Sequence, residues 1–110
     1  SFFGGTEMLI VTRDDIPGRE FEVLGLAMGS TVQSKHIGKD IGASFKGIVG
    51  GELKSYTEML DDARKQSLQR MVENAAAMGA DAIVALRFAS STIVQGAAEI
   101  LAYGTAVKFK

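Results

Sequence analysis

The residues of this sequence that could bind a metal ion are few. Its 110 residues include no cysteine and one histidine, His36. Because soft heavy metals prefer thiolate, thioether and imidazole ligands, a divalent metal ion would need His36 together with the nearby carboxylates Asp40 or Glu52. One imidazole with carboxylates makes a weak, oxygen-rich site. The ligand count favours a solvated loop histidine instead, and a site shared between subunits stays open. Four methionines fall at apolar positions and are expected in the core: Met28, Met59, Met71 and Met78.

A glycine-rich stretch, residues 47–51, precedes a predicted helix and could present backbone N–H groups to an anion. The Gly-Lys-Ser/Thr sequence of a nucleotide-binding loop does not follow it. Glu52 would also place a negative charge where the anion should lie. The stretch therefore favours a tight turn that packs the helix onto the sheet.

Catalysis would depend on carboxylates, since the sequence shows no nucleophile with an adjacent base. Asp61 and Asp62 fall on the polar side of the predicted helix, and we expect them to be solvated. Glu99 could be partly buried or could pair with Arg87 across a hairpin, and such pairs are mostly structural. A binding or structural role is therefore favoured over an enzyme. A small enzyme using interface carboxylates and a scaffold without a ligand are the alternatives. The carboxylates considered are Glu52, Glu58, Asp61, Asp62 and Glu99.

Composition places the chain among ordinary globular domains. Lysine and arginine number 12 and aspartate and glutamate 13, which gives a net charge of −1 and argues against a general nucleic-acid binder. No apolar run approaches the ~20 residues that cross a bilayer, and the first residues do not resemble a secretory signal. We expect a cytoplasmic protein with no membrane partner. Residues 1–7 are assigned to an N-terminal extension, and residues 8–110 to one domain.

The hydropathy pattern predicts the element order β-β-α-β-β. Strands are expected over residues 8–12, 20–34, 81–92 and 98–109. An amphipathic stripe from Glu52 to Met78 predicts one long helix, with a start at either 52 or 56 and a glycine cap at Gly79. The expected fold class is α+β: a sandwich of one long helix on a curved antiparallel sheet.

Two strands carry apolar or small residues on both faces, in residues 20–34 and 98–109. One helix can cover only one face of a sheet. We therefore expect a second copy of the chain to cover the other face, which predicts a homo-oligomer. The small residues around Gly104 also predict that another element approaches closely there.

Several blocks together resemble the YbjQ-like family of small bacterial and archaeal proteins, and the resemblance extends from about residue 8 to 109. It implies a dodecin-like α+β fold that assembles into a ring-shaped homopentamer, with five times the 11.7 kDa mass of one chain. For function, it supplies only the family's label, "putative heavy-metal-binding". The blocks that carry the resemblance are Gly29-Ser30-Thr31-Val32, Lys39-Asp40-Ile41, Gly50-Gly51-Glu52, Tyr56 to Arg64, Arg70-Met71, Gly79 to Val84, and Ala98 to Val107.

Overall fold

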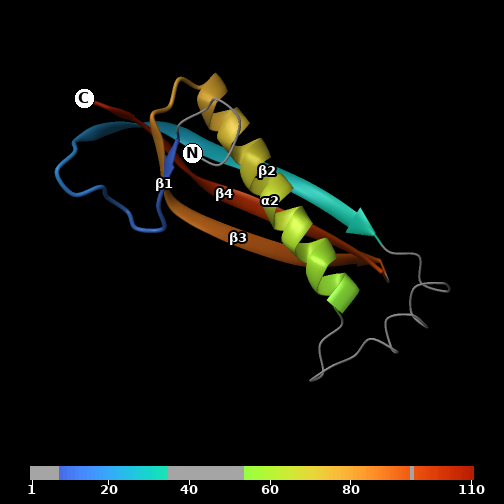
Figure 1. Cartoon of the computed structure of the whole chain (residues 1–110). Helices are drawn as coiled ribbons and strands as arrows, with labels where there is room; N and C mark the ends of the chain where they lie inside the picture. Colours follow the sequence, from blue (N-terminus) through green and yellow to red (C-terminus); the bar gives the residue numbers. More distant parts are fainter. Residues whose placement is uncertain (1–7, 35–53, 95) are drawn as a thin grey trace.

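The computed structural model describes residues 8–34, 54–94 and 96–110, and the predicted element order is present in it (Figure 1). The helix begins at Lys54, between the two predicted starts, and both strands of the C-terminal hairpin are slightly longer than expected. The short helical turn that residues 40–45 could form lies outside the described residues. The elements are β1 (Leu9–Ile10), β2 (Phe21–Ser34), α2 (Lys54–Ala77), β3 (Ala82–Val94) and β4 (Ala97–Phe109).

In the described residues the strands form one sheet in the order β1-β3-β4-β2. β4 lies between β2 and β3 and is antiparallel to both. β1 is parallel to β3, with Leu9 opposite Ala82, so the sheet is mixed and the expected antiparallel sheet is wrong at this edge. The chain reaches β2 from β1 by crossing one end of the sheet through residues 11–20. A two-residue strand carries too little pattern to show which neighbour it will pair with.

Helix α2 packs along β2 and β4 and covers one face of the sheet (Figure 1). Its buried face includes Met71, Val72 and Ala75, which share a core with the small residues Ala27 and Ala102 of the sheet. Small sheet residues let a helix lie close. The buried hydroxyl of Ser67 also donates to the carbonyl of Ile100, at 2.8 Å, so this polar group inside the interface is satisfied.

The C-terminal end of α2 is capped as the glycine signal predicted. Gly79 has a φ of +84°, the left-handed conformation that glycine adopts without strain. Its N–H donates to the carbonyl of Ala76 at 3.0 Å, and the next N–H, of Ala80, donates to Ala75 at 3.1 Å. This pair of bonds is the Schellman arrangement, which satisfies carbonyls that the helix leaves open.

Besides an irregularity near the end of β3, between Thr92 and Val94, two register shifts lie within the sheet. One lies in β2 between Val23 and Gly25, and Gly25 has a φ of +144°, a conformation that favours glycine at a bulge. The other lies in β3 between Val84 and Arg87, opposite Gly104. A Cβ on Gly104 would lie 2.7 Å from Cγ2 of Ile83, so the close neighbour expected there is β3 itself.

Within the β3 bulge, Ala85 has a φ of +58°. This conformation costs an L-residue about 1–2 kcal/mol, whereas glycine loses only its own ~0.5–1 kcal/mol of chain entropy. Ala85→Gly should therefore raise the free energy of unfolding by ~0.5–1 kcal/mol, measured by urea denaturation. Ala89→Gly, in an extended part of the same strand, is the control and should lower it by a similar amount. Destabilisation by both changes would show that the Ala85 backbone is unstrained.

Candidate functional site

The residues expected to bind a metal ion, His36, Asp40 and Glu52, lie outside the described residues, as does the glycine turn at 47–51. In the ranges 8–34, 54–94 and 96–110, no three or more histidine, aspartate or glutamate side chains gather where they could hold a metal ion. The expected metal site therefore stays a prediction, and the described part of one subunit adds no second candidate to it.

The methionines separate into core and surface positions. Met71, on the side of α2 that faces the sheet, is fully buried, and Met78 packs against the same core. Met28, expected in the core, is instead 45% exposed on the sheet face opposite the helix. The prediction for Met28 was wrong because the parity of β2 shows which residues share a face, but not which face the helix covers.

Two of the carboxylates considered for catalysis, Asp61 and Glu99, each accept a hydrogen bond. Asp61 accepts a hydrogen bond from Arg64 one turn along the helix. Glu99 is partly buried, one of the two roles considered for it, and accepts from the hydroxyl of Ser91 at 3.3 Å. The other role, a pair with Arg87, is wrong. The reason is register: the β3 bulge places Arg87 opposite Tyr103, four residues along β4 from Glu99.

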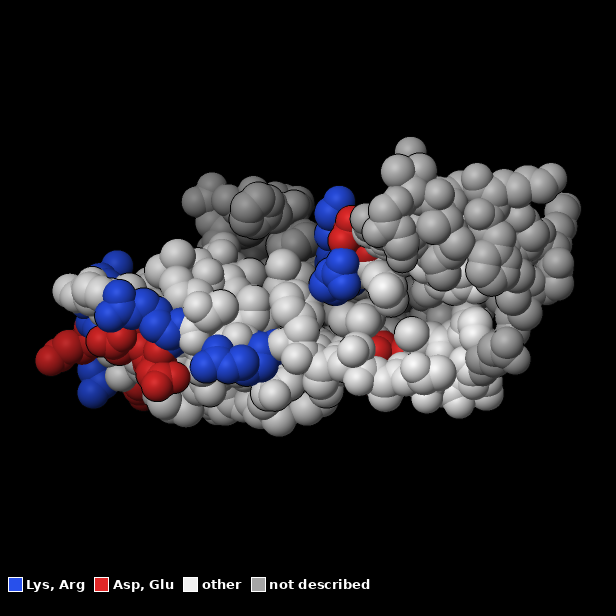
Figure 2. All heavy atoms as spheres, turned by 90° about the horizontal axis from the view of Figure 1, so that it is seen from below, with Lys and Arg blue, Asp and Glu red and all other residues white. Residues whose placement is uncertain are grey.

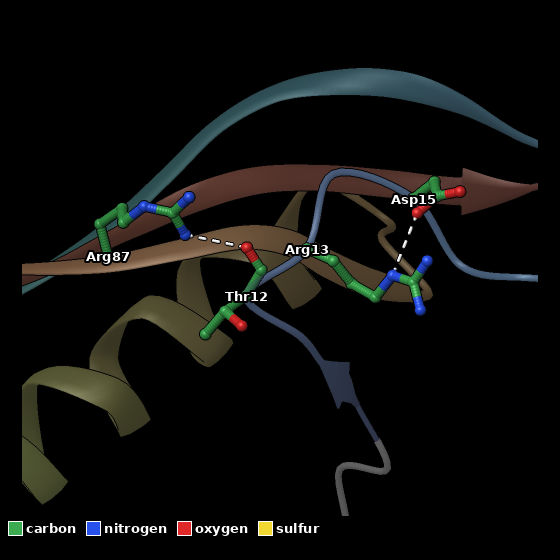
Figure 3. Close-up of polar contacts among 4 residues, drawn as sticks. All are labelled: Thr12, Arg13, Asp15 and Arg87. Carbon is green, nitrogen blue, oxygen red and sulfur yellow. Dashed lines mark hydrogen bonds and ion pairs between the residues drawn. The ribbon is translucent and has the colours of Figure 1, made fainter.

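Arg87 holds the connection between β1 and β2 against β3. Its Nη1 donates to the carbonyl of Thr12 at 2.9 Å and to that of Leu86 at 2.7 Å. In the same connection Arg13 and Asp15 form an exposed ion pair at 3.1 Å (Figure 3). Residues 11–13 therefore lie along β3 only as far as Arg87.

Among the described residues, the sheet face opposite α2 is covered at one end only, and we call its uncovered part the open face. At the covered end, Val11 and Ile16 of the connection pack on a small cluster of Ala82, Val84 and Val107. Beyond it, apolar side chains of β2 are about half exposed or more. They are Val23 at 66%, Leu26 at 57%, Met28 at 45% and Val32 at 58%.

Charge is distributed unevenly along the molecule. Figure 2 shows the molecule from below. Charged side chains gather at the end that carries residues 11–20 and the C terminus, and a smaller group lies near the middle. Most of the remaining described surface in this view is uncharged. On the open face, the apolar residues of β2 are accompanied by Tyr103 and Thr105 of β4, by Arg87, which is in line with Tyr103 and Met28, and by Glu99, which is opposite Val32.

Two exposed helix side chains bond to the outer edge of β2. The amide oxygen of Asn74 accepts from the N–H of Met28 at 3.0 Å. The guanidinium of Arg70 donates to the carbonyl of Ser30 at 2.6 Å. The sequence did not mark either residue for this role, although a polar Asn74 inside an otherwise apolar stripe was a signal. The bonds close part of a strand edge that could otherwise accept another strand.

Comparison with known proteins identifies the family of the chain. The model of the YbjQ family, described as "Putative heavy-metal-binding", matches residues 8–110. The chain belongs to the YbjQ family. Similar proteins carry the name UPF0145 protein: one from Thermosipho africanus is 56% identical over 104 residues, covering 94% of this chain and 96% of that protein. Another, from Photobacterium profundum, is 61% identical over 102 residues, covering 92% and 99%.

The fold agrees with that of a YbjQ-like solved structure. A crystal structure of a protein of unknown function of the DUF74 family, from Pediococcus pentosaceus, has a TM-score of 0.64 to this chain. The two chains are 16% identical, and the match covers 94% of this chain and 98% of that one. Among the described residues, no helix combines the length and the apolar character needed to cross a membrane.

The donor set of this YbjQ chain does not fit a soft heavy metal. With no thiolate and one imidazole in the whole sequence, binding of cadmium or copper(I) should be weak, with dissociation constants above the micromolar range. Isothermal titration calorimetry on the parent and on His36→Ala measures this. Stoichiometric sub-micromolar binding that survives His36→Ala would mean that the chain holds a soft metal without its imidazole.

Proposed function

We propose that the protein is a homo-oligomeric binding module, in which copies of the chain bury the open face of the sheet and a small ligand or ion is held where the copies meet. The observation that carries the proposal is the open face itself. Val23, Leu26, Met28 and Val32 form an apolar row along one strand of the sheet. Ser30 lies between Met28 and Val32 on the same face, and monomers rarely leave a row with so many exposed apolar side chains in water.

Burying the apolar side chains of this face between copies lowers their free energy relative to leaving them in water. Fully burying an aliphatic side chain of this size contributes roughly 1.5–3 kcal/mol, and these four side chains still expose about half or more of their surface. No aspartate, glutamate, lysine or arginine interrupts the row from Val23 to Val32. A second copy of the chain can therefore cover it without burying an unpaired charge in its centre.

Polar side chains beside the apolar row could bind a ligand. Tyr103 and Thr105 lie half-buried beside Met28 and Leu26, and Arg87 and Glu99 provide one charge of each sign. A small ligand between copies would meet an apolar floor and a few polar groups, which is the usual composition of a binding site. A divalent ion would instead rely on His36, Asp40 and Glu52.

Light scattering coupled to size exclusion tests the assembly. The untagged protein should elute with a mass several times the 11.7 kDa of one chain, and the ring expected from the resemblance predicts a factor of five. Native mass spectrometry of the same sample then tests the ligand, because a bound molecule adds a stoichiometric mass to each assembly. A stable, folded monomer at micromolar concentration would refute the proposal.

A further inference from the structure

The second half of β3 is the most exposed strand segment in the described chain. Every residue from Arg87 to Val94 is exposed. Helix α2 lies over β2 and β4 and hardly touches β3 (Figure 1). Residues 11–13 follow the outer edge of β3 only as far as Leu86 and Arg87. Beyond them, in the part of the chain that the structure describes, no strand pairs with this edge.

The outer edge of β2, on the other side of the sheet, is open near its end. Asn74 and Arg70 of the helix close this edge at Met28 and Ser30. Over residues 32–34 no strand of the described chain pairs with it. Neither residues 88–94 of β3 nor residues 32–34 of β2 include a charge or a proline, the residues that commonly prevent edge pairing.

The register of the sheet places the two open segments at the same level. Ala98 of β4 is opposite Gln33 of β2 on one side and opposite Thr92 of β3 on the other. β2 and β3 also run in the same direction, because both are antiparallel to β4. A rotation about an axis along the strands keeps the level of every residue. Such a rotation therefore brings the open segment of β3 beside the open segment of β2 in a second copy.

We propose that the outer edge of β3, residues 90–94, pairs in parallel with residues 32–34 of β2 in the next copy, and that this contact repeats around a closed ring. The inference rests on the proposed self-association and names one of its contact surfaces. A contact between two different edges joins chains head to tail, which gives a ring when the rotation closes. With the helices outside, the same rotation turns every open face toward the common axis, so the edge contact is compatible with burial of the open face.

The backbone groups of the two segments alternate as a parallel pair requires. The N–H of Leu86 points outward from β3, and by alternation so does that of Thr92. The N–H of Met28 points outward from β2, and by alternation so do those of Val32 and Ser34. At the shared level, the N–H of Thr92 can donate to the carbonyl of the partner's Val32. The carbonyl of Thr92 can accept from the N–H of the partner's Ser34.

Side chains on the helix side of the sheet are complementary across this junction, which favours a second copy over an unrelated strand. Phe88 is 44% exposed and lies opposite Ala102, which is itself opposite Gly29. Arg70 bonds to the carbonyl of Ser30 at the outer edge of β2, within one residue of that level. The partner's Arg70 would therefore lie beside the exposed ring of Phe88, and a guanidinium binds favourably over an aromatic face.

The absence of cysteine allows a test by disulfide formation in the double variant Gln33→Cys, Thr92→Cys. Across the proposed junction the two positions lie on neighbouring strands about 5 Å apart, a distance that a disulfide spans. Within one chain β4 separates them by about 10 Å, which is too far for a disulfide. Mild oxidation should therefore give a ladder of covalent multimers that ends at the number of chains in the ring.

Each single variant, Gln33→Cys or Thr92→Cys, is a matched control. One thiol per chain can give nothing larger than a covalent dimer, and the proposed junction never brings two identical positions together. Crosslinks in the double variant should form about a hundredfold faster than these dimers, because neighbouring thiols have a millimolar effective concentration, against about 10 micromolar for free collision.

A second variant tests the same edge without crosslinking. Thr92→Pro removes an N–H that points away from β4, so it leaves the β3–β4 ladder intact and blocks only the outer edge. The assembly should then dissociate at a protein concentration about tenfold higher than that of the parent, because a hydrogen bond at each junction is lost. Thr92→Ala keeps the N–H and should dissociate as the parent does.

Each outcome has a definite meaning. A ladder in the double variant that ends at the chain number given by light scattering supports the contact between β3 and β2. An oligomer whose double variant gives no ladder overturns it and leaves the proposed homo-oligomer intact. A folded monomer overturns both. Circular dichroism establishes that each variant is folded, and if the double variant is not, unchanged dissociation of Thr92→Pro overturns the contact.

Discussion

Replacing Gly29 with alanine should unfold the protein or force α2 away from β2. A Cβ at this position would lie 2.3 Å from the backbone nitrogen of Met71, 2.5 Å from the carbonyl oxygen of Ser67 and 2.7 Å from the carbonyl carbon of Arg70. Backbone atoms of a helix cannot rotate away as a side chain can. Ordinary overpacking costs about 1–3 kcal/mol, so we expect a loss above ~3 kcal/mol in the free energy of unfolding. Urea denaturation followed by circular dichroism measures it.

Gly104→Ala is the matched comparison for Gly29. The nearest atom to its added Cβ is a side-chain methyl group, Cγ2 of Ile83, at 2.7 Å, followed by the carbonyl oxygen of Val84 at 3.1 Å. A shift of the Ile83 side chain can relieve part of this contact, so the cost should stay within ~1–3 kcal/mol. If Gly29→Ala proved as stable as Gly104→Ala, the close approach of α2 to β2 would be wrong.

A single charge on the open face should dissociate the assembly. Met28 lies in the middle of the apolar row, and Met28→Asp would bury an unpaired carboxylate between copies, at a cost of several kcal/mol for each contact. We expect the mass by light scattering to fall to 11.7 kDa at micromolar concentration, where the parent remains assembled. The fold should survive, because the side chain of Met28 faces away from α2.

Gln66→Asp serves as the control for Met28→Asp, since it adds the same carboxylate to an exposed position of α2. It should leave the mass of the assembly unchanged. An assembly of Met28→Asp as large and as resistant to dilution as the parent would show that the open face is not a contact between copies.

The elements themselves were predictable from the sequence. The stripe ending at Gly79 located α2 and its cap, and alternation located β2 and β4 to within one residue of their observed ends. Small residues on β4 correctly predicted close packing, and the glycines Gly25 and Gly29 of β2 lie at a bulge and at a close approach of the helix. These signals are local, because each depends on residues a few positions apart.

The errors concern pairings between distant segments. Nothing in Leu9 and Ile10 shows that β1 joins the far edge of β3, and one bulge in β3 was enough to separate Arg87 from Glu99. Asn74 was assigned to the buried stripe of the helix, whereas it bonds to a strand edge. The candidate metal ligands His36, Asp40 and Glu52 were selected by residue type alone, and their arrangement stays a prediction.

The register of the sheet also has a consequence for the order of folding. The β3–β4 hairpin pairs neighbouring residues, from Val94 with Ala97 to Ala82 with Val107, and α2 directly precedes it. β2 is joined to β4 across a much longer stretch of chain, since Phe21 pairs with Phe109. Closing that long loop costs more entropy, so the hairpin and helix should form first and β2 should add to them late. The apolar row that we assign to self-association lies on β2 and is therefore completed last.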